Sequence, residues 1–93
     1  MDPPKIKITG PDSATVGQLT RIRFTLSKLS AVELRISREG RVGLDKIATF
    51  HRGSGSFSWR PDSPGTYEIH LGAKEQRTGK GLKGHDDATI EVN

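Results

Sequence analysis

The stretch that decides the fold is QLTRIRFTLSKLSAVELRISRE, residues 18–39, which is the longest segment without glycine or proline. A helix through it would bring Glu33 onto the apolar stripe and leave Leu34 outside that stripe. Strict alternation fits better, because hydrophobic residues occupy every second position in residues 22–26 and again in residues 32–36. The stretch therefore predicts two β-strands with a turn between them.

Similar alternating runs continue along the chain, and Gly, Pro and Asp residues typical of turns separate them. The further runs lie at residues 5–9, 42–47, 56–59, 67–71 and 88–92. Short strands at this spacing are typical of an Ig-like or fibronectin type III-like β-sandwich with Greek-key connections. We therefore predict an all-β fold of about seven antiparallel strands, with an open barrel as the alternative.

The alternation also predicts which side chains form the core, since each sheet of a sandwich buries one face. The predicted inward set is Ile6, Ile8, Ile22, Phe24, Leu26, Val32, Leu34, Ile36, Phe57, Trp59, Tyr67, Ile69, Leu71, Ile90 and Val92. Phe50 is the one aromatic residue whose direction the pattern does not assign.

Length and composition limit the chain to one small domain of 93 residues. Residues 1–4, MDPP, are interpreted as a linker end, and residues 5–93 as a single Ig-like domain excised from a larger protein. The absence of cysteine excludes disulfides, thiolate metal sites and thiol nucleophiles. No apolar run approaches the roughly 18 residues that a membrane span needs, so membrane insertion is not expected.

Several motifs go beyond a generic strand pattern. They are FTLS at 24–27, AVELRI at 31–36, GRVG at 40–43, GSFSW at 55–59 and PGTYEI at 64–69. Together they resemble bacterial Ig-like modules, in particular the Ig-like domain of flagellar hook-capping proteins and its relatives repeated in secreted and surface proteins. The resemblance implies a non-enzymatic structural or interaction module, extracellular or at the cell surface, whose partners are the neighbouring domains of its own chain.

Two aromatic residues in these motifs have structural interpretations. Gly65 permits a sharp turn, and Tyr67 at the start of the next strand can bury its ring and direct its hydroxyl to an upstream backbone group, as in a tyrosine corner. Trp59 is predicted to fill the core. Because the other rings are assigned inward as well, an exposed aromatic platform for sugars is not expected.

The residue patterns of catalysis and cofactor binding are incomplete in this sequence. Residues 79–84, GKGLKG, match GxGxxG, but the residues that follow predict a strand rather than the helix that a dinucleotide site requires. We interpret them as a flexible loop between the last two strands. No catalytic residue, cofactor or metal ligand is therefore assigned, and the chain is predicted not to be an enzyme.

The three histidines, His51, His70 and His85, lie in separate segments without the spacing of a metal site. His70 alternates with inward residues and should point to solvent. The run from His85 through Asp86 to Asp87 can offer an imidazole and two carboxylates, for which calcium is the better partner, against the alternative of a solvated loop. The sequence leaves these two interpretations open.

The net charge of +4 is unevenly distributed over the predicted strands. If the first, second, fourth and fifth strands form one sheet, its outer face is basic, with Asp45 as its one acidic residue. The predicted face consists of Lys5, Lys7, Arg21, Arg23 and Arg60. It can meet an anionic partner such as an acidic polysaccharide or a protein, or simply keep an exposed sheet soluble and monomeric. Nucleic acid is not expected, because stacking aromatics and a groove-entering helix are not predicted.

Overall fold

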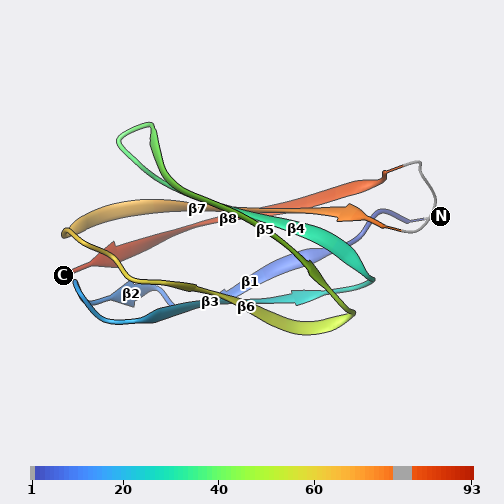
Figure 1. The fold of residues 1–93 in the computed structure, drawn as a ribbon, viewed down its shortest axis with the longest axis horizontal. Helices are drawn as coiled ribbons and strands as arrows, with labels where there is room; N and C mark the ends of the chain where they lie inside the picture. The colour runs from blue at the N-terminus through green and yellow to red at the C-terminus, as the bar shows by residue number, and fades with distance from the viewer. Residues whose placement is uncertain (1, 77–80) are drawn as a thin grey trace.

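Eight β-strands form two stacked layers in the computed structural model, which describes residues 2–76 and 81–93 (Figure 1). The strands are β1 (Ile6–Gly10), β2 (Ser13–Ala14), β3 (Thr20–Leu26), β4 (Ser30–Arg38), β5 (Arg41–Phe50), β6 (Gly53–Trp59), β7 (Gly65–Glu75) and β8 (Lys83–Val92). None of the described residues is helical, so no helix in this part of the chain could cross a membrane. The predicted all-β sandwich is confirmed.

The smaller sheet has the strand order β1-β3-β6 and the larger sheet has the order β2-β8-β7-β4-β5. All pairs are antiparallel except β2 with β8. The two-residue strand β2, which the sequence did not predict, places Ser13 beside Glu91 and Ala14 beside Val92. The two termini lie at opposite ends of a molecule whose longest dimension is 41 Å (Figure 1).

The fourth predicted strand, β5, lies in the larger sheet, so its predicted pairing with the first, second and fifth strands is wrong. A two-residue turn, Glu39-Gly40, joins β4 to β5, and Arg38 pairs directly with Arg41 across it. Both turn residues have positive φ, 53° and 79°, as a type I′ hairpin requires. So tight a hairpin holds consecutive strands in one sheet.

The core lies between the sheets and agrees closely with the predicted inward set. Thirteen of the fifteen predicted residues are buried, and Ala73 on β7 joins them. Ile8 and Trp59 are only half-buried, although both pack against the core. Ile8 adjoins a bulge in the edge strand β1, and Trp59 ends β6 at the opposite edge of the smaller sheet.

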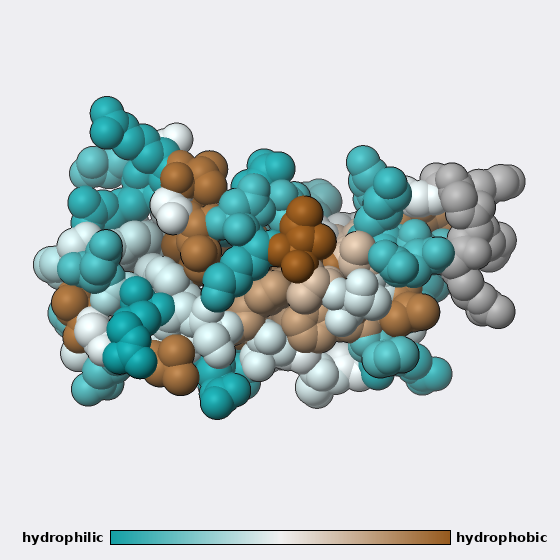
Figure 2. Space-filling model, in the orientation of Figure 1, coloured by the Kyte–Doolittle hydropathy of each residue, from teal (hydrophilic) through white to brown (hydrophobic). Residues whose placement is uncertain are grey.

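Phe50 turns inward and completes an aromatic cluster. Its ring meets Phe24 edge-on at 4.9 Å between centroids, and Phe57 at 5.2 Å. In Figure 2, hydrophobic side chains show near the middle of the visible face and in smaller patches elsewhere on it. All the aromatic side chains are thus at least partly withdrawn from solvent.

Two segments that were predicted to lie outside the strands make contacts with the sheets. Pro4, in the segment interpreted as a linker, is buried, and its carbonyl oxygen lies so close to Gly84 that a Cβ there would clash with it. The predicted loop 79–84 is shorter than expected, because Lys83 and Gly84 already pair with Lys74 and Ala73 in the larger sheet. Residues 79 and 80 of that loop lie outside the described residues.

Candidate functional site

The predicted basic residues are all exposed, and most of them share the outer face of the smaller sheet. The strand register places Lys7 opposite Thr25, Arg21 opposite Ser58 and Arg23 opposite Ser56. Residues directly opposite in a sheet point to the same side, so these cations alternate with hydroxyl groups. Lys5 continues the row just before β1, where its backbone pairs with Ser27. We call Lys5, Lys7, Arg21 and Arg23 the basic face.

Arg60 lies just beyond β6, at one end of the smaller sheet. Its Nη1 donates a hydrogen bond to the carbonyl oxygen of Gly17 at 2.8 Å. It therefore clamps the loop before β3 while its side chain remains exposed. Arg60 adds positive charge at the margin of the basic face.

The three strands of the smaller sheet contain no Asp or Glu. Asp45, predicted to reduce the charge of this face, lies on β5 and therefore in the other sheet, where its Oδ2 lies 4.0 Å from Nε of Arg35. Every acidic residue within the described strands belongs to the larger sheet. The smaller sheet thus presents cations and hydroxyl groups without a competing carboxylate on its own strands.

The outer face of the larger sheet carries a second group of functional side chains, His70, His85 and Asp87, which we call the histidine cluster. His70 on β7 pairs directly with Asp87 on β8, and His85 lies two residues before Asp87 on the same strand. Nδ1 of His70 lies 2.6 Å from Oδ1 of Asp87, and Nδ1 of His85 lies 3.2 Å from Oδ2. The two imidazole rings stack with centroids 5.8 Å apart. One carboxylate is therefore held between two imidazoles.

The electrostatics of the histidine cluster favour the ionised carboxylate. The hydrogen bond from His70 is the largest cause that lowers the pKa of Asp87 below its ordinary value, and the charges and hydrogen bond of the two histidines act in the same direction. Partial burial opposes them by raising the pKa of Asp87. The net direction is downward, so Asp87 is a carboxylate, available as an acceptor or ligand, at neutral pH.

The structure does not place His85, Asp86 and Asp87, the predicted metal-binding run, on the same side of the sheet. Successive residues of a strand point to opposite faces, so Asp86 points away from its two neighbours. Its Oδ2 accepts a hydrogen bond from the backbone N–H of Ile8 on β1 at 2.8 Å. His70, predicted only to face solvent, takes its place in the cluster.

Sequence reasoning missed this cluster because His70 and Asp87 are far apart in the chain and meet only through the register of β7 and β8. One local signal was present. His85 and Asp87 are separated by one residue, and that spacing places both side chains on one face of a strand.

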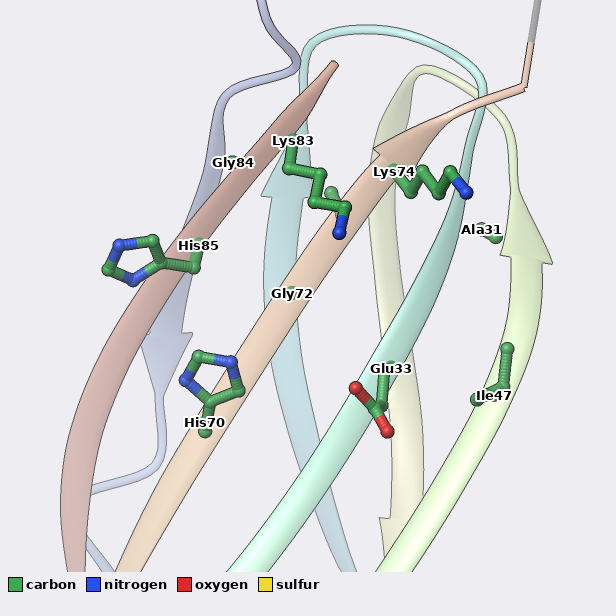
Figure 3. Close-up of a pocket in the computed structure, with 10 residues that line it drawn as sticks. Ala31, Glu33, Ile47, His70, Gly72, Lys74, Lys83, Gly84 and His85 are labelled. Carbon is green, nitrogen blue, oxygen red and sulfur yellow. The ribbon is translucent and has the colours of Figure 1, made fainter. Parts of the chain in front are cut away.

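A groove of about 390 Å³ adjoins the histidine cluster on the larger sheet. Figure 3 shows His70 and His85 on neighbouring strands along one side of it, with Glu33 and Ile47 on the other side. Gly72 lies between them and pairs with both Glu33 and His85. Because Gly72 has no side chain, the floor of the groove stays open.

The comparisons with known proteins identify the fold. A scan against protein-family models finds no match, and a search of curated proteins finds no similar sequence. Among solved structures, the CARDB domain of the PF1109 protein from Pyrococcus furiosus, in a crystal structure in complex with di-metal ions, is similar with a TM-score of 0.63. It is 19% identical, and the match covers 98% of this chain and 86% of that one. The chain has the Ig-like fold of a CARDB domain.

Two further structures agree with this result. The solution NMR structure of the same CARDB domain is similar with a TM-score of 0.53 at 17% identity, covering 97% of this chain and 92% of that one. A crystal structure of an engineered protein has a TM-score of 0.73 at 17% identity, and the match covers 97% of this chain but only 20% of that protein. The comparisons support the Ig-like part of the sequence resemblance, and its hook-capping part stays a prediction.

Proposed function

We propose that this chain is a non-catalytic Ig-like module of a larger secreted or cell-surface bacterial protein, where it separates or connects neighbouring domains. The observation that carries the proposal is the placement of the two termini at opposite ends of the 41 Å long axis (Figure 1). Because the termini of a domain often lie close together, this placement is informative. It suits a unit that extends a chain of domains. Membership of a flagellar hook-capping protein is a narrower form of the proposal and rests on the sequence motifs alone.

The burial of most aromatic side chains in the core supports a non-catalytic role. Phe24, Phe57 and Tyr67 are buried in the core, and Phe50 packs among them. Residues 81 and 82 lead directly into β8, which begins at Lys83, rather than into a helix, so the described part of the glycine-rich motif does not form a dinucleotide loop.

The spacer role can be tested with the isolated chain and with a tandem of two copies. We expect the isolated chain to sediment as a monomer of 10.2 kDa and to unfold in one cooperative transition. In small-angle X-ray scattering, the tandem should reach about twice the maximum dimension of the single chain, because its domains join at opposite ends. A tandem no longer than the single chain would contradict the spacer role.

The basic face supports a second function, the docking of an acidic polysaccharide. Arg21 and Arg23 can each offer a planar fork of donors to a carboxylate or sulfate group, and the neighbouring Ser and Thr hydroxyls can hydrogen-bond to sugar hydroxyls. With no carboxylate on the three strands of this sheet, an anionic polymer would meet little repulsion there. The module would then serve as the accessory binding domain of an extracellular enzyme.

Retention on a heparin column at rising salt concentration tests this second function. The variant Arg21→Gln/Arg23→Gln should elute at clearly lower salt than the unchanged chain. The matched control Arg35→Gln/Arg41→Gln removes the same charge from the larger sheet and should elute close to the unchanged chain. Equal losses in both variants would indicate a net-charge effect, and no retention at low salt would exclude polysaccharide docking while leaving the spacer role in place.

A further inference from the structure

The contacts within the histidine cluster stabilise the fold too little to explain why these three side chains lie together. The side chains of His70, Asp87 and His85 are 38%, 60% and 69% exposed. Ion pairs and hydrogen bonds at such exposed positions contribute about 0–1 kcal/mol to stability. This arrangement of two imidazoles around one carboxylate, on the surface of a sheet and beside a groove, is instead suited to binding a ligand.

The geometry of the cluster is close to that of a metal centre. One nitrogen of each histidine and one oxygen of Asp87 all lie within 4.8 Å of one another. In a tetrahedral zinc site, metal–ligand bonds of about 2.0–2.2 Å place the ligand atoms roughly 3.4 Å apart. Small side-chain rotations would bring the three atoms to that spacing, and the two hydrogen-bonded strands hold the backbone in register.

The chemistry of the donors selects the class of ion. Calcium takes six to eight oxygen ligands, and this cluster offers two nitrogens and one carboxylate. Imidazole nitrogen suits Zn²⁺, Cu²⁺, Ni²⁺ and related ions. Asp86, the carboxylate that would have favoured calcium, is engaged with the backbone of Ile8 on β1.

The arginine that lies beside His70 in the sheet register does not prevent the binding of a cation. Arg35 on β4 pairs with His70 in the sheet register, but its guanidinium lies 3.4 Å from a carboxylate oxygen of Glu33 and 4.0 Å from one of Asp45. Its positive charge is therefore balanced by two acidic groups.

We propose that His70, His85 and Asp87 form a site for a divalent transition-metal ion of the zinc class on the outer face of the larger sheet. The ion replaces the hydrogen bonds between the imidazole Nδ1 atoms and Asp87. Each imidazole then binds through Nδ1 as the neutral tautomer with its proton on Nε2, and only a second proton, on a ring that was charged, is released to water. Three protein ligands leave a coordination position for water or for a donor group of a partner. The site lies on the opposite sheet from the basic face, so it is independent of polysaccharide docking.

Isothermal titration of the full, untagged chain with ZnCl₂ in a non-coordinating buffer tests the proposal. We expect one ion per chain. Addition of CoCl₂ should produce visible absorption bands of nitrogen- and oxygen-coordinated cobalt, and Zn²⁺ should shift the ring resonances of His70 and His85 but not those of His51. CaCl₂ should not displace the bound Co²⁺.

Substitutions assign the ligands. His70→Gln, His85→Gln and Asp87→Asn should each weaken Zn²⁺ binding by at least about tenfold, which is the smallest effect expected even for partners of metal ligands. His51→Gln is the matched control, because His51 is an exposed histidine outside the cluster. Circular dichroism spectra of all variants should match that of the unchanged chain, since the three cluster positions are exposed or half-buried.

Three results would overturn the proposal. One is a lack of Zn²⁺ binding by a chain that circular dichroism shows to be folded. The second is an equal loss of affinity in the His51→Gln control, which would show adventitious binding to surface histidines. The third is displacement of Co²⁺ by Ca²⁺ at comparable concentration.

Discussion

At the scale of single residues, the best-defined feature is the hydroxyl of Tyr67. It donates a hydrogen bond to the backbone carbonyl of Ser63 at 2.8 Å, which confirms the predicted tyrosine corner. Arg38 supports the corner from β4, since it donates to the carbonyl of Pro64 at 2.9 Å and lies over the Tyr67 ring at 5.6 Å. The corner thus connects the turn before β7 to the larger sheet.

Tyr67→Phe should destabilise the chain by about 1–2 kcal/mol, because the carbonyl of Ser63 loses its partner in a partly buried position. The ring and its packing against Trp59 would remain. Urea denaturation measures the effect, and Thr66→Val, which removes the exposed hydrogen bond to Glu91, is a control expected to change stability less. A Tyr67→Phe variant as stable as the unchanged chain would show that the hydroxyl bond is dispensable.

The carboxyl of Asp87 gives stability a small dependence on pH. Because its pKa in the folded chain lies below the ordinary value of 3.8, its ionised form stabilises the fold above that value, and this contribution is lost as the pH falls through the folded pKa. The side chain is 60% exposed, so the effect should stay below about 1 kcal/mol.

Asp87→Asn should therefore be slightly less stable than the unchanged chain at neutral pH, with the difference disappearing in acid. Urea midpoints measured from neutral pH downward, with a chelator present to exclude metal, test this expectation. A difference that grows in acid would contradict the assigned direction of the pKa.

At the scale of elements, β8 differs most from its prediction, since it begins at Lys83 rather than near Ala88. The first half of the strand has no hydrophobic alternation, because its inward positions are Gly84 and Asp86. These residues face Pro4 and the backbone of β1 instead of the apolar core. A strand whose inward residues pack against backbone does not need hydrophobic side chains at those positions. Its sequence therefore lacks the alternation by which a strand is predicted.

Gly84→Ala tests this contact. The added Cβ would clash with the carbonyl oxygen of Pro4, so the backbone must move, and a loss of about 1–3 kcal/mol is expected. Gly43→Ala on β5 is the control, because its Cβ would meet its nearest atom at an ordinary 3.9 Å. If chemical denaturation shows the same stability for both variants, Pro4 does not pack against β8 in solution.

At the scale of the whole molecule, Trp59 packs where the edges of the two sheets meet. Its ring packs edge-on against Tyr67 at 5.0 Å and shares a groove with Gly43 and Leu44 of β5. Lys46 on β5 also crosses to the carbonyl of Ser58 on β6 at 3.1 Å. The two sheets are thus connected along this edge by a half-buried ring and one long side chain.

Trp59→Ala should destabilise the chain by about 2 kcal/mol, less than the roughly 3–5 kcal/mol expected for a fully buried aromatic residue. Phe24→Ala, at a ring only 1% exposed, provides the fully buried comparison. Thermal and urea denaturation of both variants will rank them. A larger loss for Trp59→Ala would show that this edge, rather than the centre of the core, dominates stability.

The sequence by itself determined the fold class, nearly all of the core and the exposure of the basic residues. Period-two alternation is a local property, and it assigns each side chain to one face of a strand wherever a hydrophobic core is present. The tyrosine corner was predictable for a similar reason, because Gly65 and Tyr67, which form it, are close together in the sequence.

Only the tertiary structure decided which strands become neighbours. The sheet that β5 joins, the inward turn of Phe50 and the meeting of His70 with Asp87 all depend on pairing between strands. That pairing is set by turn geometry and by hydrogen bonds between segments distant in sequence, which alternation within one strand does not encode. The basic face was therefore predictable in outline, whereas the histidine cluster became visible only when the register of β7 and β8 was known.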